Sequence, residues 1–174
     1  MNGTIGNRMR RIGVMAAALA TLAGGTARAA TYYVDAGHAQ AADTNDGSEP
    51  APWRTMQHAV DRAQAGDTVI VRAGVYDERV TVRNAGAEGR LLTLRAEPAR
   101  AARTKGFAVE ADFVAIEGFE ITDTEHGIFA GEAHRNNARK GGRFVNNYIH
   151  DITGTAITTG EHAVVRDNLA RNVG

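Results

Sequence analysis

The sequence predicts an all-β fold, a solenoid in which each turn of the chain stacks on the turn before it. The first observation behind this prediction is a repeat: at an offset of 21 residues, Phe144 aligns with Val165 and Asn147 with Asn168. The second is that the segment 114–123 aligns with the same repeat at an offset of 28. The third is that each repeat holds two short β-patterned runs separated by Gly, Asn or Asp. Repeats of this length, built from such runs, are typical of solenoid proteins.

Stacking explains why the repeat has to be regular. A single turn leaves its backbone groups unpaired, whereas stacked turns pair them as parallel strands about 4.8 Å apart. The aligned apolar positions Ile116, Phe144 and Val165 should therefore lie side by side in one continuous core. Asn147 above Asn168 would form a hydrogen-bonded amide ladder inside a bend. The alternative is two ordinary turn asparagines.

Several phrases of the sequence resemble a known superfamily. They are VAIEGFEI, VNNYIHD and VVRDN, with the opening YYVD…DTNDGSEPAPWRTMQHAVDRAQAGDTVIVRAGVYDERV, and together they span nearly everything after residue 30. They are similar to the right-handed parallel β-helix proteins, the architecture of pectate lyases, chondroitinase B and alginate lyases. The resemblance implies a right-handed parallel β-helix with an N-terminal capping α-helix. It specifies the fold more than the reaction.

Residues 1–29 have the pattern of a secretory signal peptide. Three arginines precede an apolar run at 12–23, and Ala-Arg-Ala at 27–29 marks a cleavage site, so the mature chain would begin near Ala30. The apolar run is too short to span a membrane. We therefore expect a protein that is secreted or periplasmic, with no membrane span once the signal is removed.

Charge and cysteine content exclude several classes of protein. The chain has 20 basic and 20 acidic residues, and removing the four arginines of 1–29 leaves 16 basic against 20 acidic, a net charge of about −4. This argues against a general nucleic-acid binder, which would present a basic face. The absence of cysteine excludes disulfides and zinc thiolate sites. The core alone must hold the protein, which we expect to be a monomer at full length.

After the signal we expect two regions. The segment 30–66 holds a strand at 31–37, a loop, and a helix at 55–65 that would end at Gly66 and cover the first turn as a lid. Trp53 would pack against this end, or else stack on a sugar. The segment 67–174 holds the turns of the coil and stops in mid-repeat, so we expect an incomplete helix. Its early strands are predicted at 67–71, 78–82, 91–96 and 107–111, with turns at 73–74, 84–86 and 97–98.

One acidic loop suggests a metal site. Asp43, Asn45 and Asp46 follow the order Asp-x-Asn-Asp-Gly and could supply oxygen ligands to calcium, the cofactor that we consider for this chain. Turn chemistry of Asp and Asn explains the same residues without a metal.

A basic loop suggests where a substrate could bind. The two offsets differ by seven residues, and the difference falls between Gly131 and Gly142. Insertions in solenoids project from one face, often the binding face. The loop could grip the carboxylates of an acidic polysaccharide, although a solvated surface loop is the alternative. Its basic residues are His134, Arg135, Arg139 and Lys140.

The resemblance implies a reaction that removes the proton next to a uronate carboxylate and eliminates the linked sugar. This needs a basic side chain and a cation, such as calcium, to neutralise the carboxylate. No catalytic motif of these families can be matched in the sequence, and we expect the 174 residues to lack a complete active site; Lys140 and His150 are the candidates within them. His150 precedes Asp151, but the pair occupies a turn position and adjacent strand residues point to opposite faces. We expect a lyase-like enzyme acting on an acidic polysaccharide. A non-catalytic carbohydrate-binding or cell-surface β-helix protein is the alternative.

Overall fold

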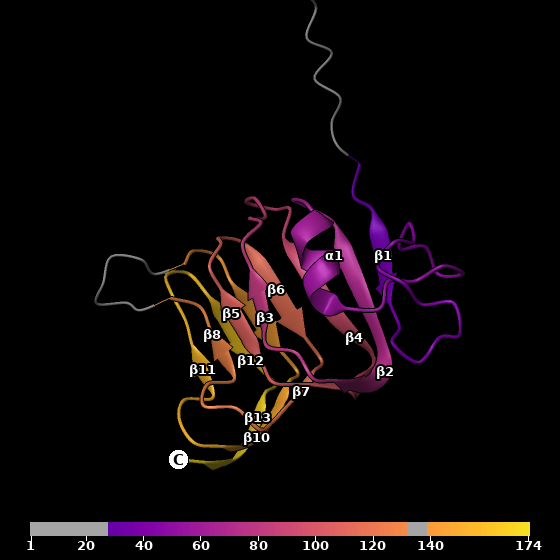
Figure 1. Ribbon diagram of the computed structural model, residues 1–174. Coiled ribbons are helices and arrows are strands. Elements are labelled where there is room, and N and C mark those ends of the chain that lie inside the picture. The colour runs from indigo at the N-terminus through magenta and orange to yellow at the C-terminus, as the bar shows by residue number, and fades with distance from the viewer. Residues whose placement is uncertain (1–27, 132–138) are drawn as a thin grey trace, which may run out of the picture.

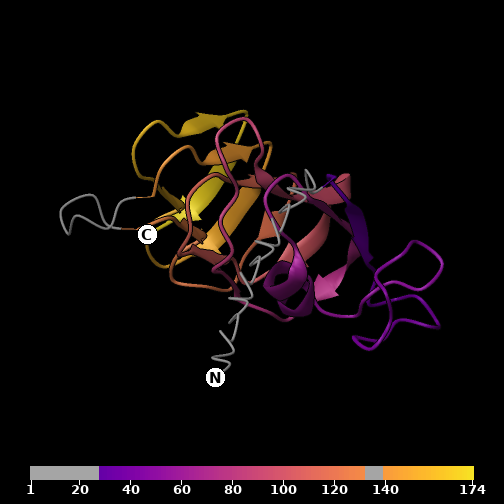
Figure 2. The ribbon, with the colours of Figure 1, turned by 90° about the horizontal axis from the view of Figure 1, so that it is seen from above.

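The structure, a computed structural model, describes residues 28–131 and 139–174 of the chain. The chain winds as a coil, and successive turns lie side by side from the indigo end to the yellow end (Figures 1 and 2). The predicted fold class is confirmed: an all-β, right-handed parallel β-helix with an N-terminal α-helix. Every named strand pair is parallel.

The coil has three faces, named here by the strands that form them. Face A contains β1 (Thr31–Val34), the first halves of β2 (Thr68–Tyr76) and β4 (Leu92–Thr104), β6 (Val114–Glu117), β9 (Arg143–Val145) and β12 (Val164–Arg166). Face B contains the second halves of β2 and β4, then β7 (Glu120–Ile121), β10 (Tyr148–Ile152) and β13 (Leu169–Val173). Face C contains β3 (Val80–Val82), β5 (Phe107–Val109), β8 (Ile128–Phe129) and β11 (Ile157–Thr158).

The predicted register of the repeat is confirmed. Ile116 pairs with Phe144, which pairs in turn with Val165, so the aligned apolar residues are neighbours on adjacent strands. Ile121 pairs with Ile149 on face B. The inward side chains of the three faces merge into one apolar cluster that runs along the coil.

The asparagine ladder is also confirmed. Asn147 is fully buried, and its Nδ2 donates to Asn168 Oδ1 at 3.0 Å and to the carbonyl of Ile116 at 3.0 Å. Its Oδ1 accepts from the backbone N–H of Phe119 at 3.0 Å. One turn further on, Asn168 Nδ2 donates to the carbonyl of Phe144 at 2.8 Å. The two amides thus satisfy the backbone groups that a sharp bend leaves unpaired.

Left-handed residues turn the corners of the coil at repeated positions. Residues with a short polar side chain, or none, tolerate this conformation better than others. The corner between faces A and B uses Gly118, Asn146 and Asp167, with φ of 73°, 58° and 59°. The corner after face B uses Asp123, Asp151 and Asn172, with φ of 54°, 51° and 50°.

The N-terminal helix closes the first turn as predicted, but it is shorter than predicted. Helix α1 spans Met56–Arg62 and buries Met56, Ala59 and Val60 against the coil. Its cap is Ala63 in an extended conformation, so Gly66, with φ of 94°, lies in the following turn instead of ending the helix. The side-chain amide of Gln57 pairs with both backbone groups of Thr81, on the outer edge of face C.

Two predicted turns are wrong. Residues 73–74 and 97–98 lie inside β2 and β4, which continue around a corner of the coil instead of ending there. Both strands pair with each other before and after an irregularity between Arg72 and Gly74. The two strands pair on each side of the corner, and within β4 the backbone turns at Arg100, which has φ of 64°.

Candidate functional site

The candidate site that contains His150 is a histidine cluster on face B, formed by Glu120, His150 and Asp151. Glu120 and Tyr148 are partners across β7 and β10, and His150 lies two residues further along β10 on the same outward side. His150 Nε2 lies 3.0 Å from Glu120 Oε1, and Nδ1 lies 2.7 Å from Asp151 Oδ2. The ring of Tyr148 stacks on the imidazole at a centroid distance of 4.3 Å.

The expectation that His150 and Asp151 point to opposite faces is wrong. Strand alternation stops at Asp151, because its φ of 51° turns the backbone into the left-handed region. The carboxylate then folds back onto the imidazole that precedes it. Asn172, one turn further on, donates to the other carboxylate oxygen of Asp151 at 2.7 Å and holds it there.

The two carboxylates favour the protonated imidazole. Burial alone lowers the pKa of His150, but the hydrogen bonds and charges of Asp151 and Glu120 outweigh it and raise the pKa above 6.5. The hydrogen bonds from Asn172 and His150 lower the pKa of Asp151 below 3.8. The side chain of His150 is only 15% exposed. The imidazolium form of His150 can donate a proton or stabilise a negative charge on a bound group. It is poorly placed to act as a base, because both ring nitrogens already face carboxylates.

Sequence reasoning identified His150 but missed Glu120 and Tyr148. The offset of 28 residues aligns Glu120 with Tyr148, and period-two alternation then places Tyr148 and His150 on one side of the strand. Applied along the strand, this register would have brought Glu120, Tyr148 and His150 to one side of face B, but not Asp151.

The basic residues of the inserted loop are only partly described. His134 and Arg135 lie outside the described residues. Arg139 lines a hollow of about 230 Å³ with Phe129 and Glu110, beside face C. Lys140 is exposed at the corner that leads into β9, where its backbone N–H donates to Asp112 at 3.0 Å.

Lys140 and His150 are therefore not brought together. Lys140 lies before the strand of face A, whereas His150 lies near the end of the strand of face B in the same turn. The two candidate catalytic residues cannot act on one bond from these positions.

The acidic loop holds its own turns together. Asp43 accepts hydrogen bonds from the backbone of Arg54 and Thr55 and from the Thr55 hydroxyl, and these bonds lower its pKa although burial opposes them. Asn45 donates to two backbone carbonyls, and Asp46 accepts from Ser48 N at 2.9 Å. Within residues 28–131 and 139–174, no group of three or more His, Cys, Asp or Glu could hold a metal ion.

Trp53 belongs to the core of this end of the molecule. It is 3% exposed, stacks on Tyr32 at a centroid distance of 4.8 Å, and donates from Nε1 to the carbonyl of Asn45 at 2.7 Å. Its ring faces are therefore covered by protein, which favours the packing role over sugar stacking. In the part of the chain that the structure describes, no helix is long and apolar enough to cross a membrane.

Parallel faces, stacked asparagines and a capping helix define the class of this protein as a parallel β-helix, and comparison with known proteins agrees. Residues 39–83 match the family described as "Protein of unknown function (DUF1565)". An uncharacterized protein of Bacillus subtilis (strain 168), YwoF, is 42% identical over 53 residues, which are 30% of this chain and 11% of that protein.

Solved structures share the fold at low identity. Pectate lyase Pel9A matches with a TM-score of 0.59 and 21% identity over 79% of this chain and 38% of its own. A GH136 lacto-N-biosidase from Eubacterium ramulus matches with a TM-score of 0.57 and 14% identity over 82% of this chain and 34% of its own. A rhamnogalacturonan lyase matches with a TM-score of 0.53 and 18% identity over 71% and 36%. The chain thus spans about a third of the length of these structures.

Proposed function

We propose that the chain is part of an exported carbohydrate-active protein that cleaves a uronate-containing polysaccharide by β-elimination. The observation that supports this best is the parallel β-helix shared with a pectate lyase and a rhamnogalacturonan lyase. The stacked strands form long, flat faces along which an extended sugar chain can lie. This support is an analogy of fold, so the reaction has to be tested directly.

The proposed step needs three groups around one uronate. A base removes the proton on the carbon next to the carboxylate, and the electron pair forms a carbon–carbon double bond as the neighbouring glycosidic C–O bond breaks. The leaving oxygen takes up a proton. Lys140 is the candidate base, with Arg139, His134 and Arg135 as candidate ligands of the carboxylate. Calcium at Asp43, Asn45 and Asp46 is proposed separately, because their loop lies at the indigo end of the coil, away from the segment that leads into β9 (Figure 1).

The test measures the ultraviolet absorbance of the unsaturated uronate product on pectate, alginate and chondroitin, with and without a calcium chelator. With the longer protein that contains this chain, we expect product on at least one substrate, and a strong loss of rate for Lys140→Ala. The matched control is Lys105→Ala, because Lys105 is the only other lysine of the chain and lies in the bend after β4, paired with Asp77. Silence on all three polymers would reject the lyase.

The second candidate function is non-catalytic binding of a carbohydrate at a cell surface. The observation that favours it is that carboxylates occupy both ring nitrogens of His150, while Lys140 lies on another part of the turn. Retention of the protein on an acidic polysaccharide resin, without product in the absorbance assay, would support this reading over the enzyme.

Export is the part of the proposal that rests on residues 1–29. We expect the mature protein, recovered from culture medium or periplasm, to begin near Ala30. Sequencing of its N-terminus tests this, and an intact Met1 on exported protein would contradict cleavage at the expected site.

A further inference from the structure

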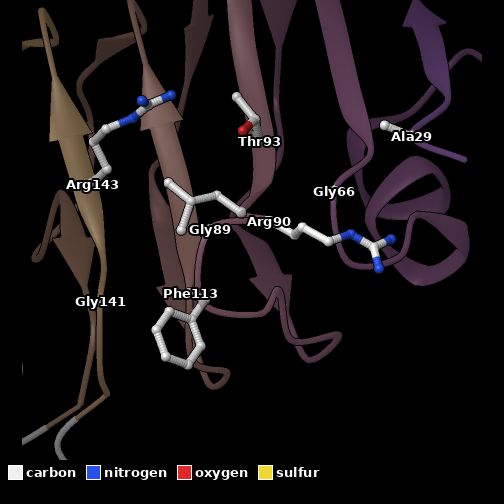
Figure 3. A pocket seen from close by; sticks show the side chains of 9 residues that line it. Ala29, Gly66, Gly89, Arg90, Thr93, Phe113, Gly141 and Arg143 are labelled. Carbon is white, nitrogen blue, oxygen red and sulfur yellow. The ribbon is translucent and has the colours of Figure 1, made fainter. Parts of the chain in front are cut away.

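A hollow on face A lies apart from the histidine cluster, and Gly141 at its rim belongs to the end of the inserted loop. It has a volume of about 600 Å³ and opens over the first residues of β4 and β9 (Figure 3). Across the register, Thr93 pairs with Ala115, which pairs with Arg143. Thr93 and Arg143 line the hollow, whereas Ala115 between them is fully buried and does not line it. The volume is of the size that small-molecule sites have.

Glycine at one rim makes room for an aromatic wall. Gly141, with φ of 63°, lies so close to Phe113 that a Cβ would stand 2.4 Å from the ring. The ring of Phe113 therefore lies against bare backbone and is half-buried at the edge of the hollow. Figure 3 shows this ring below Thr93, with Arg90 and Arg143 extending to opposite sides. The ring offers an apolar surface on which the C–H face of a sugar can pack.

The charges of the hollow have one sign. Among the residues that the structure describes, its lining includes two arginines and no acidic residue. The guanidinium of Arg90 is held by the carbonyl of Ala65 at 2.6 Å, and that of Arg143 pairs with Glu117 from outside the lining. Both side chains are thereby pre-positioned, and the side chain of Arg143 remains 42% exposed. Fixed guanidinium groups beside an apolar ring suit a ligand that carries a carboxylate on a sugar ring.

We propose that this hollow is a binding subsite for a uronate residue of an oligosaccharide, with Arg143 as its carboxylate ligand and Phe113 as its stacking surface. The choice of a uronate rests on the proposed function, whereas the anionic character of the ligand rests on the arginines. The subsite lies on a different face from the histidine cluster and adjoins Lys140, the candidate base, whose backbone carbonyl accepts from Phe113 N–H at 2.7 Å.

The experiment titrates the protein with a short oligogalacturonate, with the matching neutral galacto-oligosaccharide, and with acetate, by calorimetry. We expect binding of the oligogalacturonate only, weakened about 10- to 100-fold in Arg143→Gln through loss of a charge-assisted hydrogen bond. Arg143→Lys keeps the charge and loses the forked geometry, so its affinity for the oligogalacturonate should lie between those of the wild type and Arg143→Gln. The matched control is Arg103→Gln, an outward arginine of β4 that pairs with Glu120 across face B. Melting temperatures identify any variant that fails to fold.

Each outcome decides a different question. Oligogalacturonate binding that Arg143→Gln and Arg143→Lys leave unchanged, or that Arg103→Gln weakens equally, overturns the subsite and leaves the proposed function standing. Equal affinity for the neutral sugar also overturns the subsite, because the hollow would then recognise a sugar without its carboxylate. Equal affinity for acetate overturns it too, because the hollow would then recognise a carboxylate without its sugar. Arg143-dependent binding without any unsaturated product supports the subsite and counts against the lyase.

Discussion

At the scale of single residues, Asn147 shows how one side chain can fix the shape of a bend. It is fully buried and links its own turn to the turns on either side. It bonds to the carbonyl of Ile116 and the N–H of Phe119 in the preceding turn, and to the side-chain amide of Asn168 in the following one. The sequence predicted this contact because two asparagines share one register position. An apolar residue at this site would strand a backbone donor and a backbone acceptor inside the protein.

We predict that Asn147→Leu destabilises the fold by about 3 kcal/mol, the cost of two buried backbone groups without partners. Urea denaturation measures it. The control is Asn168→Leu, at the same register position one turn later but only half-buried, where solvent can replace the lost bonds. Equal losses in the two variants would contradict the role assigned to burial.

The histidine cluster gives a prediction about pH. The folded pKa of His150 is raised above 6.5, so its contribution to stability is full below about pH 6.5 and is lost as the pH rises through the raised value. The lowered pKa of Asp151 acts in the opposite direction: its contribution holds above pH 3.8 and is lost as the pH falls through the lowered value. The histidine cluster therefore stabilises the fold most between pH 3.8 and about pH 6.5.

Melting temperatures recorded between about pH 5 and pH 8 check this prediction, because this is the range in which histidine titrates. Wild-type protein should lose stability toward the upper end relative to His150→Gln, which keeps a polar side chain and cannot titrate. His38→Gln serves as the control, since His38 lies in the N-terminal loop and contacts Gln40. A His150→Gln profile parallel to that of the wild type would contradict the assignment. The charged groups facing His150 are Glu120 and Asp151, with Arg171 as its partner on β13.

At the scale of elements, helix α1 depends on side chains of the coil beneath it. Both carboxylate oxygens of Glu78 accept from its first N–H groups, at 3.1 Å from Met56 N and 3.0 Å from Gln57 N. Asn84 donates to three carbonyls at the other end, those of Val60, Asp61 and Ala63. A helix of seven residues is too short to be stable alone, so these contacts and its buried face hold it in place.

Replacing Glu78 should therefore loosen the lid. We expect Glu78→Ala to lower the free energy of unfolding by about 1–2 kcal/mol, the usual cost of losing a helix N-cap. Asp77→Ala is the control, because Asp77 is the adjacent carboxylate but forms only a surface ion pair with Lys105. Denaturant titration compares the two variants, and a larger loss for Asp77→Ala would argue against the capping role.

The sequence predicted which elements exist better than where they end. Periodic apolar residues placed α1 and the strands of face C, because burial sets that pattern directly. The ends depend on long-range pairing, which local sequence does not report. Pro98 suggested a turn, yet β4 runs through it, because β2 pairs with β4 at Glu97 before the proline and again at Ala102 after it. The left-handed turn at Asp151, which completes the histidine cluster, is another local feature that strand alternation alone does not predict.

At the scale of the whole molecule, the two ends of the coil differ. Helix α1 covers one end, whereas β12 and β13 present apolar side chains to solvent at the other. Val165 is 47% exposed although it continues the core column of Ile116 and Phe144. An apolar surface beside an unpaired parallel strand is a template for another strand. The 174-residue chain is therefore expected to self-associate through this surface.

We predict that Val165→Lys lowers the self-association of this chain, because a charge on the exposed column disfavours strand pairing with a second copy. Val75→Lys is the matched control: Val75 is 65% exposed on β2, far along the coil from β12, and its replacement should change association little. Sedimentation velocity over a range of concentrations gives the mass of each variant. Equal effects of the two lysines would indicate a general gain in solubility, and a wild-type chain that stays monomeric at every concentration would show that the column is not adhesive.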